Sequence, residues 1–297
     1  MIQRFLNNLR ELNQLPKRLE SLTRINEIIQ GHINRIACIE GEKYRQLLFS
    51  TSKYKEGKRL EPYGFKVYSQ CDEDGIIQEI FNRIGIANKR FVEFGVGNGM
   101  ENNTLKLLLE GWSGLWIEGN EDYVKQIQET FRDIVDDGRL MVKAAFITRD
   151  NINNLIAHYF TGEIDLLSID IDGNDIYVLD AINVIRPRVI ITEYNGKLPP
   201  PISVAQRYNP NFKWDGSDYS GSSLKAITKI AASKGYSLVG CNVVGVNAFF
   251  VRDELAGDHF QAPFTAENHY QPTRYFLWQT FSADSGHPTG WGPYDRI

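Results

Sequence analysis

Apolar side chains follow two different periods along this chain. Near its start they recur every three or four positions, at Leu12, Leu15, Leu19, Leu22, Ile25, Ile29, Ile33 and Ile36. This spacing places them on one face of a helix, expected over residues 16–38 because Pro16 suits a first helical turn, although Gly31 weakens the interior. Such a face must be covered, either by the rest of the chain or by a second copy in a coiled-coil-like homo-oligomer.

After a helix expected over 72–83, the pattern changes to short apolar runs separated by helical segments. Strands are expected over 90–93, 114–118, 140–146, 164–170 and 188–193, and helices over 103–110, 122–131, 151–159 and 175–182. A further helix over 224–234 precedes two strands, 236–241 and 248–251, joined by a turn. We therefore predict an α/β, Rossmann-like, doubly wound fold whose mostly parallel seven-stranded sheet is closed by an antiparallel hairpin.

The same pattern divides the chain into three parts. Residues 1–59 form a helical N-terminal arm, residues 60–255 form the sheet domain, and residues 256–297 form an irregular C-terminal extension. The extension is rich in aromatic residues and glycine, and two roles stay open for it: a lid over a site, or contact with a second subunit.

Composition narrows the classes of partner. The 297 residues carry a formal net charge of −4, which argues against nucleic-acid binding, since that requires clustered Lys and Arg. The three cysteines, Cys38, Cys71 and Cys241, are widely spaced, which indicates a reducing compartment without disulfides. No segment is apolar enough to span a membrane. We expect a cytoplasmic protein with a small-molecule or glycan substrate.

The strongest motif is a glycine-rich turn after the strand at 90–93. It contains Glu93, Gly95, Gly97, Asn98 and Gly99, and a helix is expected to follow it. Glycines allow the backbone to approach a ligand closely. A dinucleotide-binding turn requires a third glycine where this chain has Met100. An acid two residues before the first glycine instead suits the amino group and sulfonium of S-adenosylmethionine.

A second acid supports an adenosine cofactor. Glu118 ends the next strand, about 20 residues after the glycine turn, where a carboxylate can accept hydrogen bonds from both ribose hydroxyls. Gly119 and Asn120 follow it and are counted with the cofactor site. Phe146, at the end of the third strand, is a candidate to hold the adenine ring.

Polar side chains also follow the fourth and fifth strands. Asp170, Asp172, Glu193 and Asn195 are expected at the sheet edge where ligands of open α/β sheets bind. Asp170 and Asp172 are candidate general bases, and Asp170 is also counted with the cofactor site. Asp170, Glu193 and Asn195 are candidate ligands for Mg²⁺ or Mn²⁺, with helix and strand capping as the structural alternative. Residues 213–219, which mix aromatic and short polar side chains, are suited to a sugar ring.

Several stretches together resemble the FkbM-like class I methyltransferases. They are residues 69–75, 91–104, 114–120, 164–173 and 236–242, within a likeness that covers about 65–255. The resemblance implies S-adenosylmethionine binding, with Glu93, Gly95, Gly97 and Glu118 at the cofactor and Asp170 at the reaction centre. It also implies O-methylation, commonly of sugar hydroxyls. Asp172 stands where the family commonly has glutamate, and the trio of metal candidates loosely resembles that of catechol-type methyltransferases.

The sequence therefore predicts an S-adenosylmethionine-dependent O-methyltransferase acting on a saccharide or a nucleotide-linked sugar. Three alternatives stay open at this point. The acceptor is a polyketide or another natural product, the chain is a nucleotide-dependent oxidoreductase on the same fold, or it is a binding protein without turnover.

Overall fold

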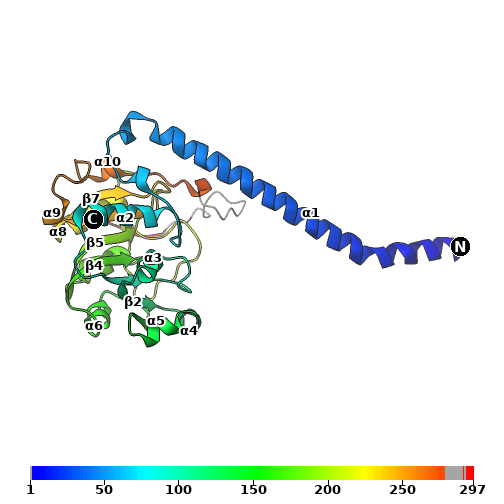
Figure 1. Ribbon diagram of the computed structural model, residues 1–297, viewed down its shortest axis with the longest axis horizontal. Helices are drawn as coiled ribbons and strands as arrows, with labels where there is room; N and C mark the ends of the chain where they lie inside the picture. Colours follow the sequence, from blue (N-terminus) through cyan, green and yellow to red (C-terminus); the bar gives the residue numbers. More distant parts are fainter. Residues whose placement is uncertain (1, 278–289, 291) are drawn as a thin grey trace. The chain divides into compact units, whose positions relative to one another are not determined.

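The computed structural model describes residues 2–277, 290 and 292–297, with side chains for all of these except 2–15 and 17. Of the described residues, 2–48 with 276–277 form one compact unit, and 49–275 with 290 and 292–297 form the other. The first unit is dominated by one helix, α1 (Ile2–Phe49), drawn in blue in Figure 1. The predicted helix over 16–38 was too short, and Pro16 lies inside α1, not in its first turn.

A seven-stranded sheet forms the centre of the second unit. Its strands are β1 (Arg90–Phe94), β2 (Ser113–Glu118), β3 (Leu140–Ala144), β4 (Gly162–Ile169), β5 (Ile185–Glu193), β7 (Tyr236–Cys241) and β8 (Asn247–Arg252). They lie in the order β3-β2-β1-β4-β5-β8-β7, with β1 to β5 parallel and β8 antiparallel to both of its neighbours. This confirms the predicted Rossmann-like sheet and its closing hairpin. The strand order reverses between β1 and β4, which opens a crevice at their carboxyl ends.

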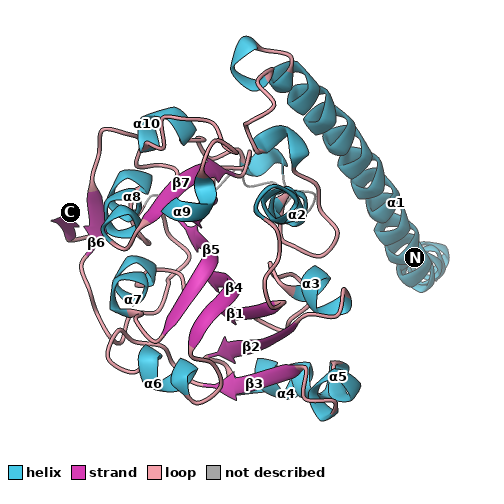
Figure 2. Ribbon diagram, turned by 60° about the vertical axis from the view of Figure 1, so that its left-hand side comes forward, coloured by secondary structure: helices cyan, strands magenta, loops and turns pink. Residues whose placement is uncertain are grey.

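Helices cover both faces of the sheet, as Figure 2 shows. The helices α2 (Glu73–Ile84), α3 (Leu105–Leu109) and α4 (Glu121–Thr130) cover one face, and α5 (Arg132–Asp136) follows α4. The helices α6 (Ile152–Ala157), α7 (Asp175–Ala181) and α8 (Leu224–Ser233) cover the other. Each face buries its own hydrophobic cluster because side chains alternate between the two faces along every strand. Among the described helices, none combines the length and hydropathy needed to cross a bilayer.

The closing hairpin is fastened to α2 by a buried acid. Glu73 accepts hydrogen bonds from the side-chain amides of Asn242 and Asn247, at 2.8 and 2.9 Å, and from the backbone N–H of Cys71. The next residue, Asp74, accepts three backbone N–H bonds from residues 67–69. The acids of the 69–75 motif therefore fix the loop before α2 and the loop that joins β7 to β8.

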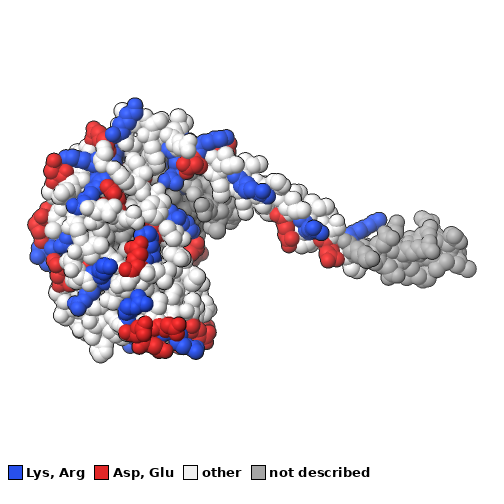
Figure 3. All heavy atoms as spheres, in the orientation of Figure 1, with Lys and Arg blue, Asp and Glu red and all other residues white. Residues whose placement is uncertain are grey.

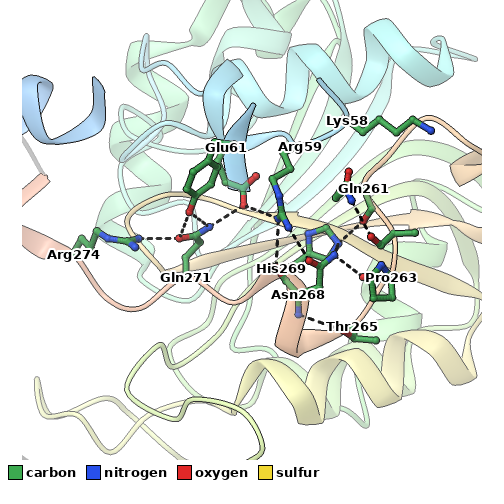
Figure 4. Close-up of polar contacts among 12 residues, drawn as sticks. Lys58, Arg59, Glu61, Gln261, Pro263, Thr265, Asn268, His269, Gln271 and Arg274 are labelled. Carbon is green, nitrogen blue, oxygen red and sulfur yellow. Dashed lines mark hydrogen bonds and ion pairs between the residues drawn. The ribbon is translucent and has the colours of Figure 1, made fainter. Parts of the chain in front are cut away.

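A second buried network fixes the segment after the sheet, which contains α9 (Asp253–Ala256) and α10 (Ala266–His269). Figure 4 shows Gln271 between Glu61 and Arg274; its amide donates to the Glu61 carboxylate, and its carbonyl accepts from the guanidinium. His269 bonds the carbonyl of Gln261, and burial lowers its pKa to about 4. These contacts join the segment to η1 (Ser52–Tyr54) and η2 (Glu61–Tyr63), while η3 (Tyr275–Leu277) follows.

A small two-stranded sheet, β6 (Val204–Gln206) with β9 (Tyr294–Arg296), joins the end of the chain to the loop after β5. The sequence did not predict it, because three-residue strands carry too few alternating positions to recognise. Most of the remaining C-terminal extension, residues 278–289 and 291, lies outside the described residues. The expected roles of lid or subunit contact therefore stay predictions for that part.

Acidic and basic side chains are interspersed over the face shown in Figure 3, and acidic residues gather at its lower edge. The exposed acids of α4 and α5 and of the turn after them are Glu121, Asp122, Glu129, Asp133, Asp136 and Asp137. Mixed charge of this kind is ordinary for the surface of a protein with a small net charge.

Candidate functional site

A cavity of about 630 Å³ opens at the carboxyl ends of β1, β2 and β4, where the strand order reverses. Eight of the predicted site residues line it: Gly95, Gly97, Glu118, Gly119, Asn120, Phe146, Asp170 and Asp172. The other five, Glu93, Asn98, Gly99, Glu193 and Asn195, lie nearby but not in its wall. The structure therefore brings together residues that lie as much as 77 positions apart in the sequence, from Gly95 to Asp172.

The turn after β1 requires glycine at Gly95. Its φ of +69° is unfavourable for other residues, and a Cβ placed there would lie 1.7 Å from the carbonyl oxygen of Asp170. Gly97 has a φ of +56°, but a Cβ there would meet no atom within 4 Å. The first glycine thus permits direct contact between the loops after β1 and β4, and the second leaves open space beside the cavity.

Glu118 connects this turn to the end of β2. One carboxylate oxygen accepts the backbone N–H of Gly97 at 2.8 Å, and the other accepts that of Asn120 at 2.8 Å. Asn120 also caps α4 by accepting the N–H of Asp122. The carboxylate is held in one orientation, and each oxygen retains a lone pair for a ligand in the cavity.

Glu93, at the end of β1, holds the glycine turn to the segment that starts α3. Its carboxylate accepts the backbone N–H groups of Asn103 and Thr104 and the Thr104 hydroxyl, which in turn accepts from the indole of Trp116. Burial raises its pKa to about 7, against the lowering effect of these donors. Asn98 accepts the N–H of Met100, and a Cβ on Gly99 would lie 2.8 Å from the Trp116 ring.

An acidic trio, Asp170, Asp172 and Glu193, lies at the ends of β4 and β5. Each side chain offers a carboxylate oxygen within 4.8 Å of those of the other two. Burial and the neighbouring carboxylates raise the pKa of Asp170 and of Glu193 well above their usual values. Asp172, beside Asp170, has a φ of +58°, a strained conformation for a residue other than glycine.

Asn195, the third predicted metal ligand, is engaged elsewhere. Its amide donates to the carbonyls of Asp218 and Ser220, and its side-chain oxygen accepts the N–H of Lys197. The side chain thus fixes the loop after β5. In the structure, the third group beside Asp170 and Glu193 is the carboxylate of Asp172, where the sequence predicted the side chain of Asn195.

The opposite wall comes from the loop after β6. Phe212, Lys213 and Trp214 line the cavity, and the indole of Trp214 donates to the Ser217 carbonyl at 2.7 Å. The sequence placed Trp214 in an aromatic stretch suited to a sugar ring, and in the structure it lines the same cavity as the cofactor candidates. Sequence reasoning missed Tyr123, which lines the cavity from the first turn of α4. Its position three residues after the helix cap was the available signal.

Tyr275 lies in the C-terminal extension, for which the sequence left a lid role open, but it was not named as a site residue. Burial and the nearby Glu193 and Asp218 carboxylates raise its pKa to about 12. The segment before it crosses the end of β5, where the Tyr194 hydroxyl donates to the Gln271 carbonyl and the Tyr270 hydroxyl donates to that of Gly196. This segment of the predicted extension at 256–297 therefore brings the Tyr275 phenol close to Glu193.

Comparisons with known proteins give no family model that matches and no curated protein that matches. Among solved structures, the chain is similar to the N-terminal domain of EvdMO1 with S-adenosylhomocysteine bound, with 14% identity, a TM-score of 0.39, and coverage of 65% of this chain and 90% of that one. It is also similar to an S-adenosylmethionine-dependent methyltransferase from Clostridium acetobutylicum, with 12% identity, a TM-score of 0.38, and coverage of 71% and 98%. Against PKMT2 from Rickettsia typhi, with 15% identity and a TM-score of 0.29, the match covers 40% of this chain and about a quarter, 24%, of that one.

Alanine substitutions at Gly95 and Gly97 distinguish the cost of a steric clash from the cost of an unfavourable φ angle. Gly95→Ala should lower the free energy of unfolding by about 3 kcal/mol or more, because the new methyl group meets the Asp170 carbonyl. Gly97→Ala, which adds the same group in open space, should cost about 1 kcal/mol. Urea unfolding of both variants measures the difference, and equal losses would contradict the assigned contact.

The raised pKa of Glu93 predicts a pH dependence of stability. Between its ordinary value of 4.5 and about 7, the folded protein binds more protons at this site than the unfolded chain, so its contribution to stability falls as pH rises. Glu93→Gln should therefore reduce the downward slope of unfolding free energy between pH 5 and 7. Glu129→Gln, at an exposed position on α4, is the control and should leave the slope unchanged.

Proposed function

We propose that this chain is an S-adenosylmethionine-dependent O-methyltransferase that acts on a hydroxyl of a saccharide or a nucleotide-linked sugar. The observation that carries the proposal is the position of Glu118. Its carboxylate accepts the N–H of Gly97 in the glycine turn, and it lines the same cavity as Asp170 and Asp172. An adenosine-binding acid and a group able to accept a proton thus share one cavity, as transfer of the methyl group of this cofactor to a hydroxyl requires.

In this proposal Glu118 accepts hydrogen bonds from the ribose hydroxyls through the lone pairs that its two backbone donors leave free. Phe146 and Tyr123, both partly exposed in the cavity, contact the adenine ring. Gly97, whose Cα faces open space, allows the methionine portion to lie close to the backbone, and Gly95 keeps the turn against the loop that carries Asp170. Glu93 acts through the turn that it supports, because three donors already occupy its carboxylate.

The reaction is a displacement at the methyl carbon. The acceptor oxygen forms a bond to that carbon while the carbon–sulfur bond breaks, which yields a methyl ether and S-adenosylhomocysteine. The hydroxyl proton passes to a carboxylate of the acidic trio, and Asp170 and Asp172, which both line the cavity, are the candidates. Positioning of the two reactants contributes much of the acceleration.

The acidic trio also fits a divalent cation. Three carboxylates that approach one another within 4.8 Å repel one another, and oxygen ligands of this kind suit Mg²⁺ or Mn²⁺. We propose Asp170, Asp172 and Glu193 as the ligands, in place of the set that included Asn195. When bound, the ion lowers the pKa of the acceptor hydroxyl. Asp172, the most exposed of the three, is then the candidate to accept the hydroxyl proton as well.

Two features support a sugar as the acceptor. Trp214 and Phe212 offer aromatic faces beside the cavity, and Lys213 between them offers a cation that suits the phosphates of a nucleotide-linked sugar. The sequence resemblance described above implies the same class of acceptor. Neither feature is needed for cofactor binding, so the two halves of the proposal can be tested separately.

Binding of the cofactor tests the first half. Calorimetry should show that the protein binds S-adenosylmethionine and not NAD. Glu118→Gln should weaken that binding about 10- to 100-fold, because a charged acceptor is lost. Glu129→Gln should bind as the parent protein does, and the thermal unfolding of each variant shows whether it is folded. Tight binding of NAD would favour an oxidoreductase instead.

Turnover tests the second half. Labelled methyl transfer to a panel of nucleotide-linked sugars should occur, should cease with a chelator and should return with Mg²⁺ or Mn²⁺. Glu193→Gln should lower kcat about a hundredfold or more while the affinity for S-adenosylmethionine stays unchanged, since Glu193 lies outside the cavity wall. Full activity in the presence of the chelator would remove the metal from the mechanism, and transfer only to non-sugar hydroxyls would remove the saccharide.

A further inference from the structure

The helix α1 carries an apolar seam that other described residues leave exposed. Its positions alternate in steps of three and four: Leu22, Ile25, Ile29, His32, Ile36 and Ile39. The five apolar members are 48–61% exposed. This is the heptad spacing of a coiled coil, with Leu22, Ile29 and Ile36 at one core position and the other three at the second.

Within the described part of this unit, the side chains that pack on α1 do so on the C-terminal side of the seam. Phe276 packs edge-on against Tyr44, with ring centroids 5.2 Å apart, and Leu277 lies beside Gly41. The heptad pattern ends in the same region, since the next two core positions are Lys43 and Gln46. A long helix draws most of its stability from packing of its apolar face, so residues 22–39 require a partner.

We propose that α1 joins three copies of this chain into a parallel, in-register coiled coil through the seam at 22–39. Isoleucine predominates at both core positions, which favours three or more strands over two. His32 is the one polar member, and a single polar core position penalises registers in which it faces isoleucine. The inference rests on α1 alone and is independent of the proposed function.

Charges beside the seam specify the parallel orientation. Arg35 precedes the core residue Ile36, and Glu40 follows the core residue Ile39. In a parallel, in-register coiled coil, residues at these two positions, five apart in sequence, face each other between neighbouring helices. Arg35 of one copy then pairs with Glu40 of the next. An antiparallel arrangement does not form this pair.

One heptad earlier, an apolar pair occupies the two flanking positions that Arg35 and Glu40 occupy here. Ile28 and Ile33 occupy the same two flanking positions and are 52% and 49% exposed. In the parallel register Ile28 of one copy meets Ile33 of the next, which broadens the buried face in the manner expected for more than two strands. The charged pair and the apolar pair thus require the same register and the same orientation.

Charge exchange tests the register in the full-length protein. Sedimentation velocity should give a trimer for the parent. Glu40→Arg places it opposite Arg35 and should raise the concentration at half-assembly about tenfold. The double variant R35E/E40R restores opposite charges and should return to within about twofold of the parent. Glu27→Arg, which makes the same change on the outer face of α1, should have no effect.

Cysteine crosslinking tests the orientation. In a Cys38→Ser background, Ile36→Cys should crosslink to its own equivalent in a parallel, in-register assembly, while Glu27→Cys on the outer face should not. A monomeric parent, a double variant no better assembled than Glu40→Arg, or Ile36→Cys that fails to crosslink would each overturn the proposal. Because none of these readouts depends on cofactor or turnover, their failure is distinct from failure of the proposed function.

Discussion

The contact between Gly95 and the carbonyl of Asp170 is the constraint on which the site depends. With a hydrogen in place of a side chain, the loop after β1 lies directly against the loop after β4. The first loop carries the Gly97 amide that orients Glu118, and the second carries Asp170 and Asp172. The absence of a side chain at Gly95 therefore brings the turn beside Glu118 and the loop with the two aspartates into one cavity wall.

Much of this could be predicted from the sequence, because buried strands and amphipathic helices leave periodic patterns. The order of strands and helices and the closing hairpin followed from such patterns, and eight of the predicted residues line the cavity, in keeping with their position at strand ends. Asn195 was predicted as a metal ligand from its position after β5, and in the structure its amide bonds the loop at 218–220. Sequence reports position along a strand more reliably than side-chain direction.

What could not be predicted depends on contacts between distant segments. Tyr275 and the strand β9 lie beyond the periodic part of the chain, and only the folded structure brings them to β5 and β6. Burial and nearby carboxylates raise the pKa of Asp170, and two of those carboxylates, Glu93 of β1 and Glu73 of α2, come from segments that no local motif contains. The C-terminal segment and the sheet domain thus contribute to one site, held by the buried network around Gln271 shown in Figure 4.

The central claim is that the crevice between β1 and β4 holds the adenosine of a sulfonium cofactor. A crystal structure of the protein grown with S-adenosylhomocysteine tests it most directly. The account predicts the ribose hydroxyls within about 3 Å of the Glu118 carboxylate and the sulfur on the side of Asp170. An empty crevice, or a ligand whose ribose lies away from Glu118, would contradict it.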